Sequence, residues 1–550
     1  MSSSATFTGR VRWLSVGFVL VFVAYSSAQL LQTALNGDRG YECLFAVYAT
    51  FGLFSLYAPA LVAALGPNRL LPAAACGYAF MVGANLYPGE GLLVPSCVFV
   101  GACAAALWSA QAVYVGQVAL ALSRSEAREL TLCTSELNAA FYSRFMFSGA
   151  VSGLFSSAVF FSGVPNAVFL LFLLLTGVAC AGVGALLALP RAEDPSTRTV
   201  ALPGCGGTEN VPLATDGLNS KASDEFWLGV AAGPTDRAAA NASAEAVPVE
   251  AAAPGDAAGA PAVVAAIRPT LLYMVRFLAT DRRMRFIIPT IFVNGAGAGF
   301  VNGVWMGRIV SARLGVQHVG LVGALYAVIS SFAATQVWGR LAQRPSFGRR
   351  WCFVGSLAIY SLWYALFALY AAATPANDGA PSPATFAILF IGAAVHGFAD
   401  PVLSSFIPAT LQVFFSGGRD ALCAMSSVRV VYSLGFALQQ ALSIGLAARG
   451  GARIAEQASL LAALTLLAGA ALAYLQLRVY SIDGEALALE ATSAPAASAP
   501  AAAAPVPAAV APAPKTAIPA PALPPASVPE ATGATAPPER SDALSRNSLA

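Results

Sequence analysis

The sequence predicts an all-α polytopic membrane protein with about twelve transmembrane helices arranged in two six-helix bundles. Of its 550 residues, 57% are hydrophobic and 10% are charged, whereas about a quarter of the residues of a soluble globular domain are charged. Apolar runs of about 20 residues recur, and each is long enough to cross a bilayer as a helix. A polar stretch from Pro190 to Arg283 separates two long hydrophobic blocks, which is the layout of a transporter-type fold built from two repeats.

The composition changes along the chain predict five segments. The central stretch and the end of the chain are rich in Ala, Gly, Ser, Thr and Pro, and they hold too little apolar surface to offset chain entropy. We therefore expect a cytoplasmic N-terminus (1–12), a first six-helix bundle (13–189), a mostly disordered cytoplasmic loop ending in a short amphipathic helix (190–283), a second six-helix bundle (284–480) and a disordered Ala/Pro-rich cytoplasmic tail (481–550).

Hydropathy and length place six spans in each half. The first apolar run is too long for the core of a signal peptide and is counted as a span. The spans expected in the first half are Trp13–Leu35, Tyr41–Leu65, Arg69–Tyr87, Leu92–Leu122, Asn138–Phe161 and Asn166–Leu189. Those expected in the second half are Phe286–Met306, His318–Leu341, Trp351–Ala373, Thr385–Phe415, Cys423–Ala448 and Ala455–Leu477.

The distribution of arginines predicts the orientation. With the N-terminus inside, the loops on the inner side carry the larger set of arginines, among them Arg69, Arg124, Arg340 and Arg350. Positive charge collects in cytoplasmic loops, so we expect both termini and the central loop in the cytoplasm. The sequon Asn241-Ala-Ser243 lies in that loop and is expected to be unglycosylated.

A short amphipathic helix is expected just before the seventh span. Leu271, Leu272, Val275 and Leu278 recur at helical spacing, and arginines flank them. This pattern is typical of a helix lying on the cytoplasmic membrane surface. An early start of the seventh span is the alternative.

Nothing in the sequence indicates an enzyme. It has no glycine-rich phosphate loop, no paired catalytic carboxylates and no His/Cys set at metal-ligand spacing. The net charge of +3 gives no indication of a nucleic-acid partner. Several of the nine cysteines lie inside apolar runs, where they behave as small hydrophobic residues. We therefore expect no cofactor and no metal.

Three ionisable residues fall at membrane depth, where an unpaired charge is costly. Arg144 and Arg429 lie about two turns into spans that enter from the cytoplasm, so each could also extend its side chain to the interface. Asp400 lies deeper, beside Pro401, and needs a partner within the protein. Arg429 on the neighbouring span is the partner we expect, in a structural ion pair or a ligand site.

Two further sets of residues follow helical spacing. Trp108, Gln111 and Tyr114 form a polar-aromatic strip on the fourth span, suited to helix packing or to a substrate site. The seventh span places Gly295, Gly299, Gly303 and Gly307 on one face, where another helix can approach closely. Packing is the expected role of these glycines, with gating between the halves as the alternative.

Several stretches together resemble one family. These are Gly101-Ala-Cys-Ala-Ala-Ala-Leu-Trp108-Ser-Ala-Gln111-Ala-Val-Tyr114, Met284-Arg-Phe-Ile-Ile-Pro289, Gly397-Phe-Ala-Asp400-Pro-Val and Arg429-Val-Val-Tyr-Ser-Leu434-Gly-Phe436. The chain resembles the uncoordinated-93 (unc-93-like) family, a branch of the major facilitator superfamily. The resemblance covers nearly everything except the central loop and the tail. It departs from the family at Val431-Tyr432, where relatives often carry Trp-Gln.

The resemblance implies a major-facilitator fold with two pseudo-symmetric bundles. It also implies a role as a regulatory subunit of a potassium channel, or as an escort that moves a membrane receptor through the secretory pathway. The alternative is a transporter that moves a small solute between the bundles. Asp400 is the one convincing acid within the spans, and Gln343 stands where the loop motif of typical transporters carries an acid. Both features favour the regulatory role, in the plasma membrane or an endomembrane.

Overall fold

The computed structural model describes residues 3–128, 130–190, 273–342, 344, 347–373, 382–415, 418–447 and 453–479. Helices form nearly all of this part of the chain. The expectations for the central loop between residues 191 and 272, for the sequon at Asn241 and for the tail after residue 480 lie outside the described residues.

The first half consists of six helical rods, two of which are interrupted. The second rod breaks at residues 55–57 and the fifth at Met146. In chain order the helices are α1 (Ser3–Asn36), α2 (Asp38–Phe54), α3 (Ala58–Leu65), α4 (Pro67–Ala84), α5 (Glu90–Glu126), α6 (Leu130–Phe145), α7 (Phe147–Phe161) and α8 (Ala167–Leu187). Each rod coincides with one of the spans expected from hydropathy.

The second half also consists of six rods, and four of them contain π-helical turns. The first three rods are α11 (Arg282–Phe300) with η2 (Val301–Val310) and α12 (Ser311–Leu314), α13 (Val316–Phe332) with η3 (Ala333–Trp338) and α14 (Gly339–Ala342), and α15 (Gly348–Ala373). The others are α16 (Pro383–Pro401) with η4 (Val402–Phe406) and α17 (Ile407–Phe414), α18 (Gly418–Ala447), and α19 (Ile454–Tyr474) with η5 (Leu475–Val479).

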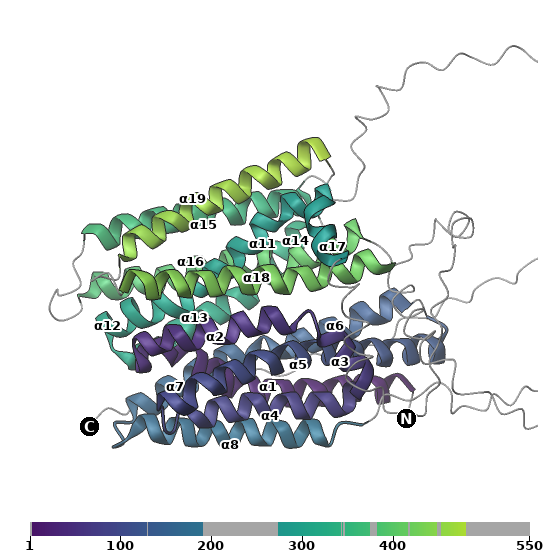
Figure 1. Cartoon of the computed structure of the whole chain (residues 1–550), viewed down its shortest axis with the longest axis horizontal. Helices are drawn as coiled ribbons and strands as arrows, with labels where there is room; N and C mark the ends of the chain where they lie inside the picture. The colour runs from purple at the N-terminus through teal and green to yellow at the C-terminus, as the bar shows by residue number, and fades with distance from the viewer. Residues whose placement is uncertain are drawn as a thin grey trace, which may run out of the picture. The chain divides into compact units, whose positions relative to one another are not determined.

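Ten of the rods in the described residues are long and apolar enough to cross a membrane. The two others are α4 and the rod formed by α2 and α3. The first begins with the polar sequence Pro67-Asn-Arg69, and the second is divided between Phe54 and Ala58. Figure 1 shows the rods of each half lying lengthwise beside one another. The expected fold class, an all-α polytopic membrane protein, is confirmed.

The two halves meet chiefly where α2 packs against α18, where α7 packs against α13, and where α1 packs against η2 and α13. Glycines allow the closest approach, because a Cβ atom on Gly153 would collide with the backbone of Gly320. Hydrogen bonds support two of these pairs. Ser157 donates to the carbonyl of Gln317 at 2.7 Å, and Thr33 donates to the carbonyl of Gly303 at 3.0 Å.

A separate short helix precedes α11 over residues 273–280. Asp281 ends it and caps α11, because its side chain accepts hydrogen bonds from the backbone N–H groups of Arg283 and Met284 at 2.8 and 3.1 Å. The early start of the seventh span is therefore wrong. The short helix buries Met274 and Phe277 against the protein and leaves Val275 exposed. Val275 of the expected stripe therefore faces away from the core, and Leu271 and Leu272 lie outside the described residues.

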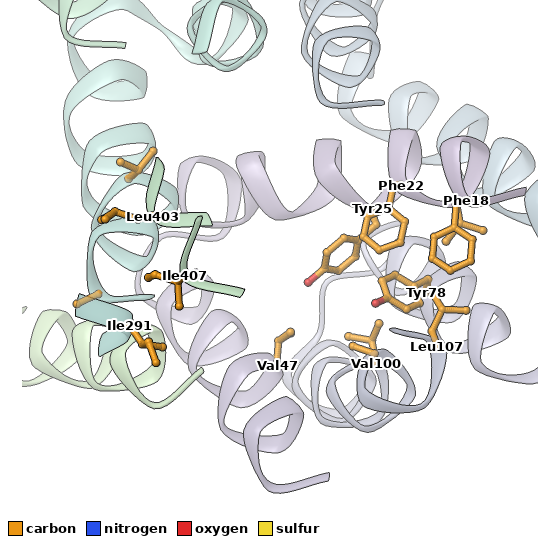
Figure 2. Close-up of a cluster of buried hydrophobic side chains, with 14 of the residues drawn as sticks. Phe18, Phe22, Tyr25, Val47, Tyr78, Val100, Leu107, Ile291, Leu403 and Ile407 are labelled. Carbon is orange, nitrogen blue, oxygen red and sulfur yellow. The ribbon is translucent and has the colours of Figure 1, made fainter. Parts of the chain in front are cut away.

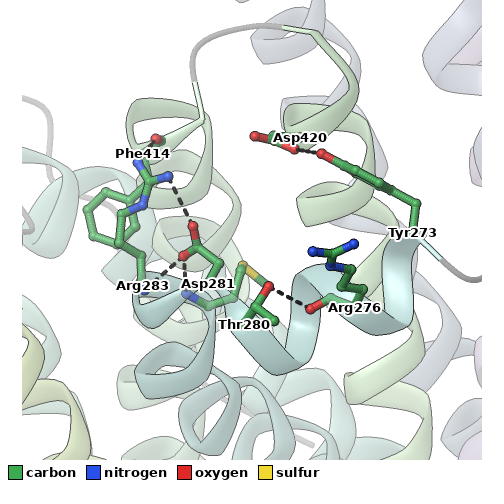
Figure 3. Close-up of polar contacts among 8 residues, drawn as sticks. Tyr273, Arg276, Thr280, Asp281, Arg283, Phe414 and Asp420 are labelled. Carbon is green, nitrogen blue, oxygen red and sulfur yellow. Dashed lines mark hydrogen bonds and ion pairs between the residues drawn. The ribbon is translucent and has the colours of Figure 1, made fainter.

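Two contacts fix this region to the rest of the second half (Figure 3). The hydroxyl of Tyr273 donates a short hydrogen bond to Asp420 at the start of α18. Arg283 donates to the carbonyl of Phe414 at 2.5 Å and lies 4.1 Å from the centre of the Phe415 ring. The entry of the chain into the second half is thus held by α18 and by the end of α17.

Candidate functional site

Asp400 lies midway along the rod that contains α16, surrounded by tyrosines. Tyr360 of α15 donates a hydrogen bond to Oδ1 of Asp400 at 3.3 Å. Tyr326 of α13 is an electrostatic neighbour of the same carboxyl. Three rods therefore meet at one carboxyl group, and hydroxyl groups rather than a cation satisfy it.

His396, one turn before Asp400, extends this cluster. Its two ring nitrogens lie 3.5 Å from the Tyr360 hydroxyl and 3.3 Å from the Tyr364 hydroxyl. The rings of these two tyrosines are stacked, with centroids 5.7 Å apart. His396 also lines a cavity of about 10 Å³, together with Tyr326 and Trp305, which is room for about one water molecule. The His396 side chain is buried.

Arg429 lies on α18 and reaches across to the first half. Its guanidinium donates to the hydroxyl of Ser109 on α5 at 2.9 Å. Tyr142 of α6 is its electrostatic neighbour. This contact joins a cation of the second half to a neutral hydroxyl of the first half.

The expected ion pair between Asp400 and Arg429 is wrong. Among the ion pairs of the described residues, none joins these two side chains, and their hydrogen-bond partners are separate. The physical reason is geometric: Asp400 faces α13 and α15 within the second half, whereas Arg429 faces α5 of the first half.

Arg144 lies in the last turn of α6, which ends at Phe145 just before the break at Met146. Its guanidinium donates a short hydrogen bond to the carbonyl of Ala140 in its own helix. The side chain is partly exposed, and this position accords with either of the roles considered for it.

The three residues of the polar-aromatic strip on α5 lie in three different environments. Trp108 lies in an aromatic cluster, with ring centroids 5.6, 5.3 and 5.2 Å from those of Phe18, Phe22 and Phe145. Gln111 is buried, and among the described residues its Nε2 has no hydrogen-bond partner. Tyr114 donates to the carbonyl of Pro190 at 2.8 Å. Figure 2 shows Phe18 and Phe22 beside Tyr25 and Tyr78.

The four glycines of the seventh span meet different partners along their length. A Cβ atom on Gly295 would collide with the backbone of Tyr432, and one on Gly299 would lie 3.0 Å from the carbonyl oxygen of Phe436. Both partners belong to α18. A Cβ atom on Gly303 would meet Gln440 and Tyr41, and one on Gly307 would meet Thr33 of α1. The first glycines of the row therefore pack within the second half, whereas the last one, Gly307, packs against the first half.

Sequence reasoning missed a contact at the end of the rods where α1 ends and α2 begins. Arg308 of η2 and Asp38 of α2 form an ion pair of 2.6 Å between the halves. Both residues were visible as charges next to spans, but nothing in their spacing connects positions 270 residues apart. The tyrosines around Asp400 were missed for the same reason, because they come from two other spans, α13 and α15.

No metal site is evident in the part of the chain that the structure describes. It contains no group of three His, Cys, Asp or Glu side chains that could hold an ion. The candidate polar groups are therefore the Asp400 carboxyl with its tyrosine hydroxyls inside the second half, and the Arg429 guanidinium where it contacts Ser109 of the first half.

The fold is that of a major-facilitator membrane protein. The chain is similar to the crystal structure of the nucleoside transporter NupG, with a TM-score of 0.53 and 12% identity over 85% of this chain and 98% of that one. It is also similar to a POT family transporter in complex with a thioalcohol-conjugated peptide, with a TM-score of 0.54 and 11% identity over 86% and 96% of the two chains. At these identities the similarity establishes the fold and nothing about a substrate.

Within this class, the chain belongs to the UNC-93 family, whose model, described as "Ion channel regulatory protein UNC-93", matches residues 32–436. Protein unc-93 homolog A of Bos taurus is 27% identical over 439 residues, covering 77% of this chain and 85% of the relative. The putative potassium channel regulatory protein unc-93 of Caenorhabditis elegans is 32% identical over 108 residues, covering 20% of this chain and 15% of the relative. The resemblance seen in the sequence is confirmed.

Proposed function

We propose that this multi-pass membrane protein is a regulatory subunit or trafficking escort of another membrane protein. The partner is either an ion channel, with a potassium channel as the expected type, or a membrane receptor. The observation that carries this proposal is the match of residues 32–436 to a family described as ion channel regulatory proteins. The relative from Caenorhabditis elegans, named as a potassium channel regulator, supports the choice of channel. Regulation of this kind requires that the protein bind two states or locations of its partner with different affinity.

The polar groups within the rods also favour regulation over driven transport. Proton-coupled transporters use several intramembrane carboxylates in a relay. In the described residues, Asp400 is the one carboxyl group held midway along a rod, and tyrosine hydroxyls satisfy it. A single carboxyl does not make a relay.

The alternative function is facilitated movement of a small solute between the halves. The fold shared with the nucleoside and peptide transporters favours it. Neither function involves catalysis, and the families that resemble this chain are regulatory or transporter-like rather than enzymes. We infer a location in the plasma membrane or an endomembrane. The arginine distribution supports an orientation with both termini in the cytoplasm.

Two measurements separate these functions. Deletion of the protein from its native cells should change the surface level or open probability of one channel or receptor, and proximity labelling should identify that partner as a membrane neighbour. The purified protein in liposomes should accumulate no solute when a proton or sodium gradient is imposed. Gradient-driven uptake of a defined solute that Asp400→Asn abolishes would overturn the regulatory function.

A matched pair of variants controls for folding in the cell experiment. Gly295→Leu places a side chain against the backbone of Tyr432, whereas Gly177→Leu on α8 has open space around it. Re-expression of Gly177→Leu should restore the channel phenotype, and re-expression of Gly295→Leu should not. Restoration by both variants at equal surface levels would show that the helix packing at Gly295 is not needed for function.

A further inference from the structure

We propose that a patch of four exposed arginines, at the end of the second half expected to face the cytoplasm, binds the phosphate groups of anionic lipid headgroups. The arginine patch consists of Arg276 on the short helix of residues 273–280, Arg282 and Arg285 at the start of α11, and Arg478 in η5. This lipid site goes beyond the proposed regulatory function and does not depend on it. The patch suits a membrane lipid better than a soluble anion, because exposed apolar side chains lie directly beside the arginines.

Two contacts bring the elements of the arginine patch together. Arg285 donates a hydrogen bond to the carbonyl of Ala279 at 2.8 Å, so the start of α11 lies against the end of the short helix. The ring centroid of Phe286 lies 4.7 Å from that of Tyr474, four residues before Arg478. α11 also packs against η5. The arginines of α11 and η5 therefore lie within about one turn of this ring pair, toward the same end of the rods.

The positive charge of the arginine patch is not balanced by acids within the described residues. Asp281 caps α11 and pairs with Arg283 at 3.1 Å. Asp420 accepts a short hydrogen bond from Tyr273. In Figure 3 the guanidinium of Arg276 lies apart from the Asp281–Arg283 pair. Among the ion pairs of the described residues, none includes an arginine of the patch, whereas other arginines do have a carboxylate partner, namely Arg128, Arg308 and Arg453.

The side chains next to the arginine patch suit the glycerol and acyl parts of a lipid. Tyr474 and Leu477 are both exposed beside Arg478. Tyrosine is typical of the boundary between the headgroups and the apolar interior of a membrane. Further along α19, Leu466 and Leu467 continue the exposed apolar surface toward the middle of the rod. A lipid whose phosphate contacts the arginines can thus lay an acyl chain against α19, which a soluble anion cannot do.

Arginine and phosphate match in charge and in shape. A guanidinium presents its N–H donors in a planar fork that contacts two phosphate oxygens at once. Anionic lipids are concentrated in the cytoplasmic leaflet, where each nearby arginine contributes about fivefold to affinity. Phosphatidylcholine gains less, because its headgroup carries a cation of its own. Binding should therefore be strongest for a headgroup with several phosphate groups, which engages more than one arginine of the patch.

The test is lipid binding by the full-length protein, purified in a maltoside detergent and followed by native mass spectrometry and thermal unfolding. The probes are the dioctanoyl forms of phosphatidylinositol bisphosphate, phosphatidylserine and phosphatidylcholine, with soluble inositol trisphosphate as a headgroup without chains. An anionic lipid at about a hundred times its Kd should raise the unfolding temperature by several degrees. The rise should be largest with phosphatidylinositol bisphosphate, absent with phosphatidylcholine, and smaller at about 0.5 M salt, which screens exposed charges.

Matched variants assign the binding to the arginine patch. Replacing its four arginines by glutamine should weaken the binding of phosphatidylinositol bisphosphate at least tenfold. The control variant removes the same number of exposed arginines from other places expected to face the cytoplasm, and it should change the affinity by less than twofold; its substitutions are at Arg12, Arg69, Arg124 and Arg340. If the fourfold variant fails to fold, the double variant Arg282→Gln, Arg478→Gln should still weaken binding severalfold, with Arg69→Gln, Arg124→Gln as its control.

Three results would overturn the proposal. The first is that no anionic lipid binds to or stabilises the wild-type protein. The second is an equal loss of binding in the patch variant and its control, which would mean that the lipid responds to total charge alone. The third is equal affinity for soluble inositol trisphosphate, which would mean that the site takes a soluble anion and gains nothing from the apolar surface of α19. Because no partner protein is present, each result is independent of the regulatory function.

Discussion

Arg308 and Asp38 join the two halves by an ion pair of 2.6 Å between Nη2 and Oδ1. The same guanidinium lies 5.0 Å from the centre of the Tyr41 ring, so it is held by a carboxylate and an aromatic face together. The side chain of Asp38 is 74% exposed and that of Arg308 is 23% exposed. Water and salt therefore screen much of the attraction.

This exposure predicts a small energetic contribution. Asp38→Asn should lower the stability of the purified protein by about 1 kcal/mol or less, because exposed ion pairs contribute about that much. The loss should shrink further as salt is added, as measured by thermal unfolding in detergent. Glu456→Gln is the control, since its partner Arg453 lies in the same half. A loss of several kcal/mol that is insensitive to salt would contradict this view of the pair.

The contact between α11 and α18 predicts a severe effect at Gly295. Gly295→Ala should destabilise the protein by about 1–3 kcal/mol, because the new methyl group meets backbone that cannot move aside easily. Gly177→Ala is the matched control, a helical glycine with nothing within 4 Å of the added atom. It should be neutral, or stabilising by up to about 1 kcal/mol through helix propensity. Equal unfolding temperatures for the two variants would mean that α11 and α18 do not approach each other as closely at Gly295 as described above.

The separate partners of Asp400 and Arg429 predict additive effects in the absence of a ligand. The stability losses of Asp400→Asn and Arg429→Gln should add to within about 0.5 kcal/mol in the double variant, as expected for side chains that do not touch. Arg429→Gln and Ser109→Ala should not add, because each removes the same hydrogen bond. Unfolding of the singles and doubles measures both cycles. A strongly non-additive loss for the Asp400→Asn, Arg429→Gln double variant would instead support the ion pair that the sequence suggested.

The orientation is tested by epitope tags. The arginine distribution predicts that tags inserted at Asn219 and after Ala550 are reached by antibody only after the plasma membrane is permeabilised. A third tag after Gly37, in the turn between α1 and α2, should be reached on intact cells. Staining of the Asn219 tag on intact cells would reverse the assignment.

The rods could be predicted from the sequence because hydrophobic length is a local property. The span ends expected at Leu35 and Leu65 lie next to Gly37 and Gly66, which both adopt positive φ angles at the boundaries of helices. The side-chain contacts between different spans could not be predicted from the sequence. Asp400 and Arg429 are on neighbouring spans, but the rotation of each helix about its axis decides what a side chain faces. That rotation is set by packing at distant positions such as Gly295 and Gly153.

The glycines of the seventh span show how the local pattern also changes along one rod. Even spacing placed all four on one face of an ideal α-helix. The rod becomes π-helical from Val301, and a π-helix has more residues per turn, so the later glycines rotate relative to the earlier ones. Gly295 and Gly299 therefore meet α18, whereas Gly307 meets Thr33 of the first half.

The chain is held locally where it leaves the first half and where it enters the second. At the exit, Tyr114 and Asn68 both donate to the carbonyl of Pro190, at 2.8 and 3.4 Å. At the entry, Tyr273 is bonded to Asp420, and Asp281 caps α11. Each half thus fixes its own end of the connection, and covalent linkage raises the effective concentration of one half for the other. The polypeptide could then be cut between residues 190 and 273 into two co-expressed fragments that reassemble through their own helix contacts.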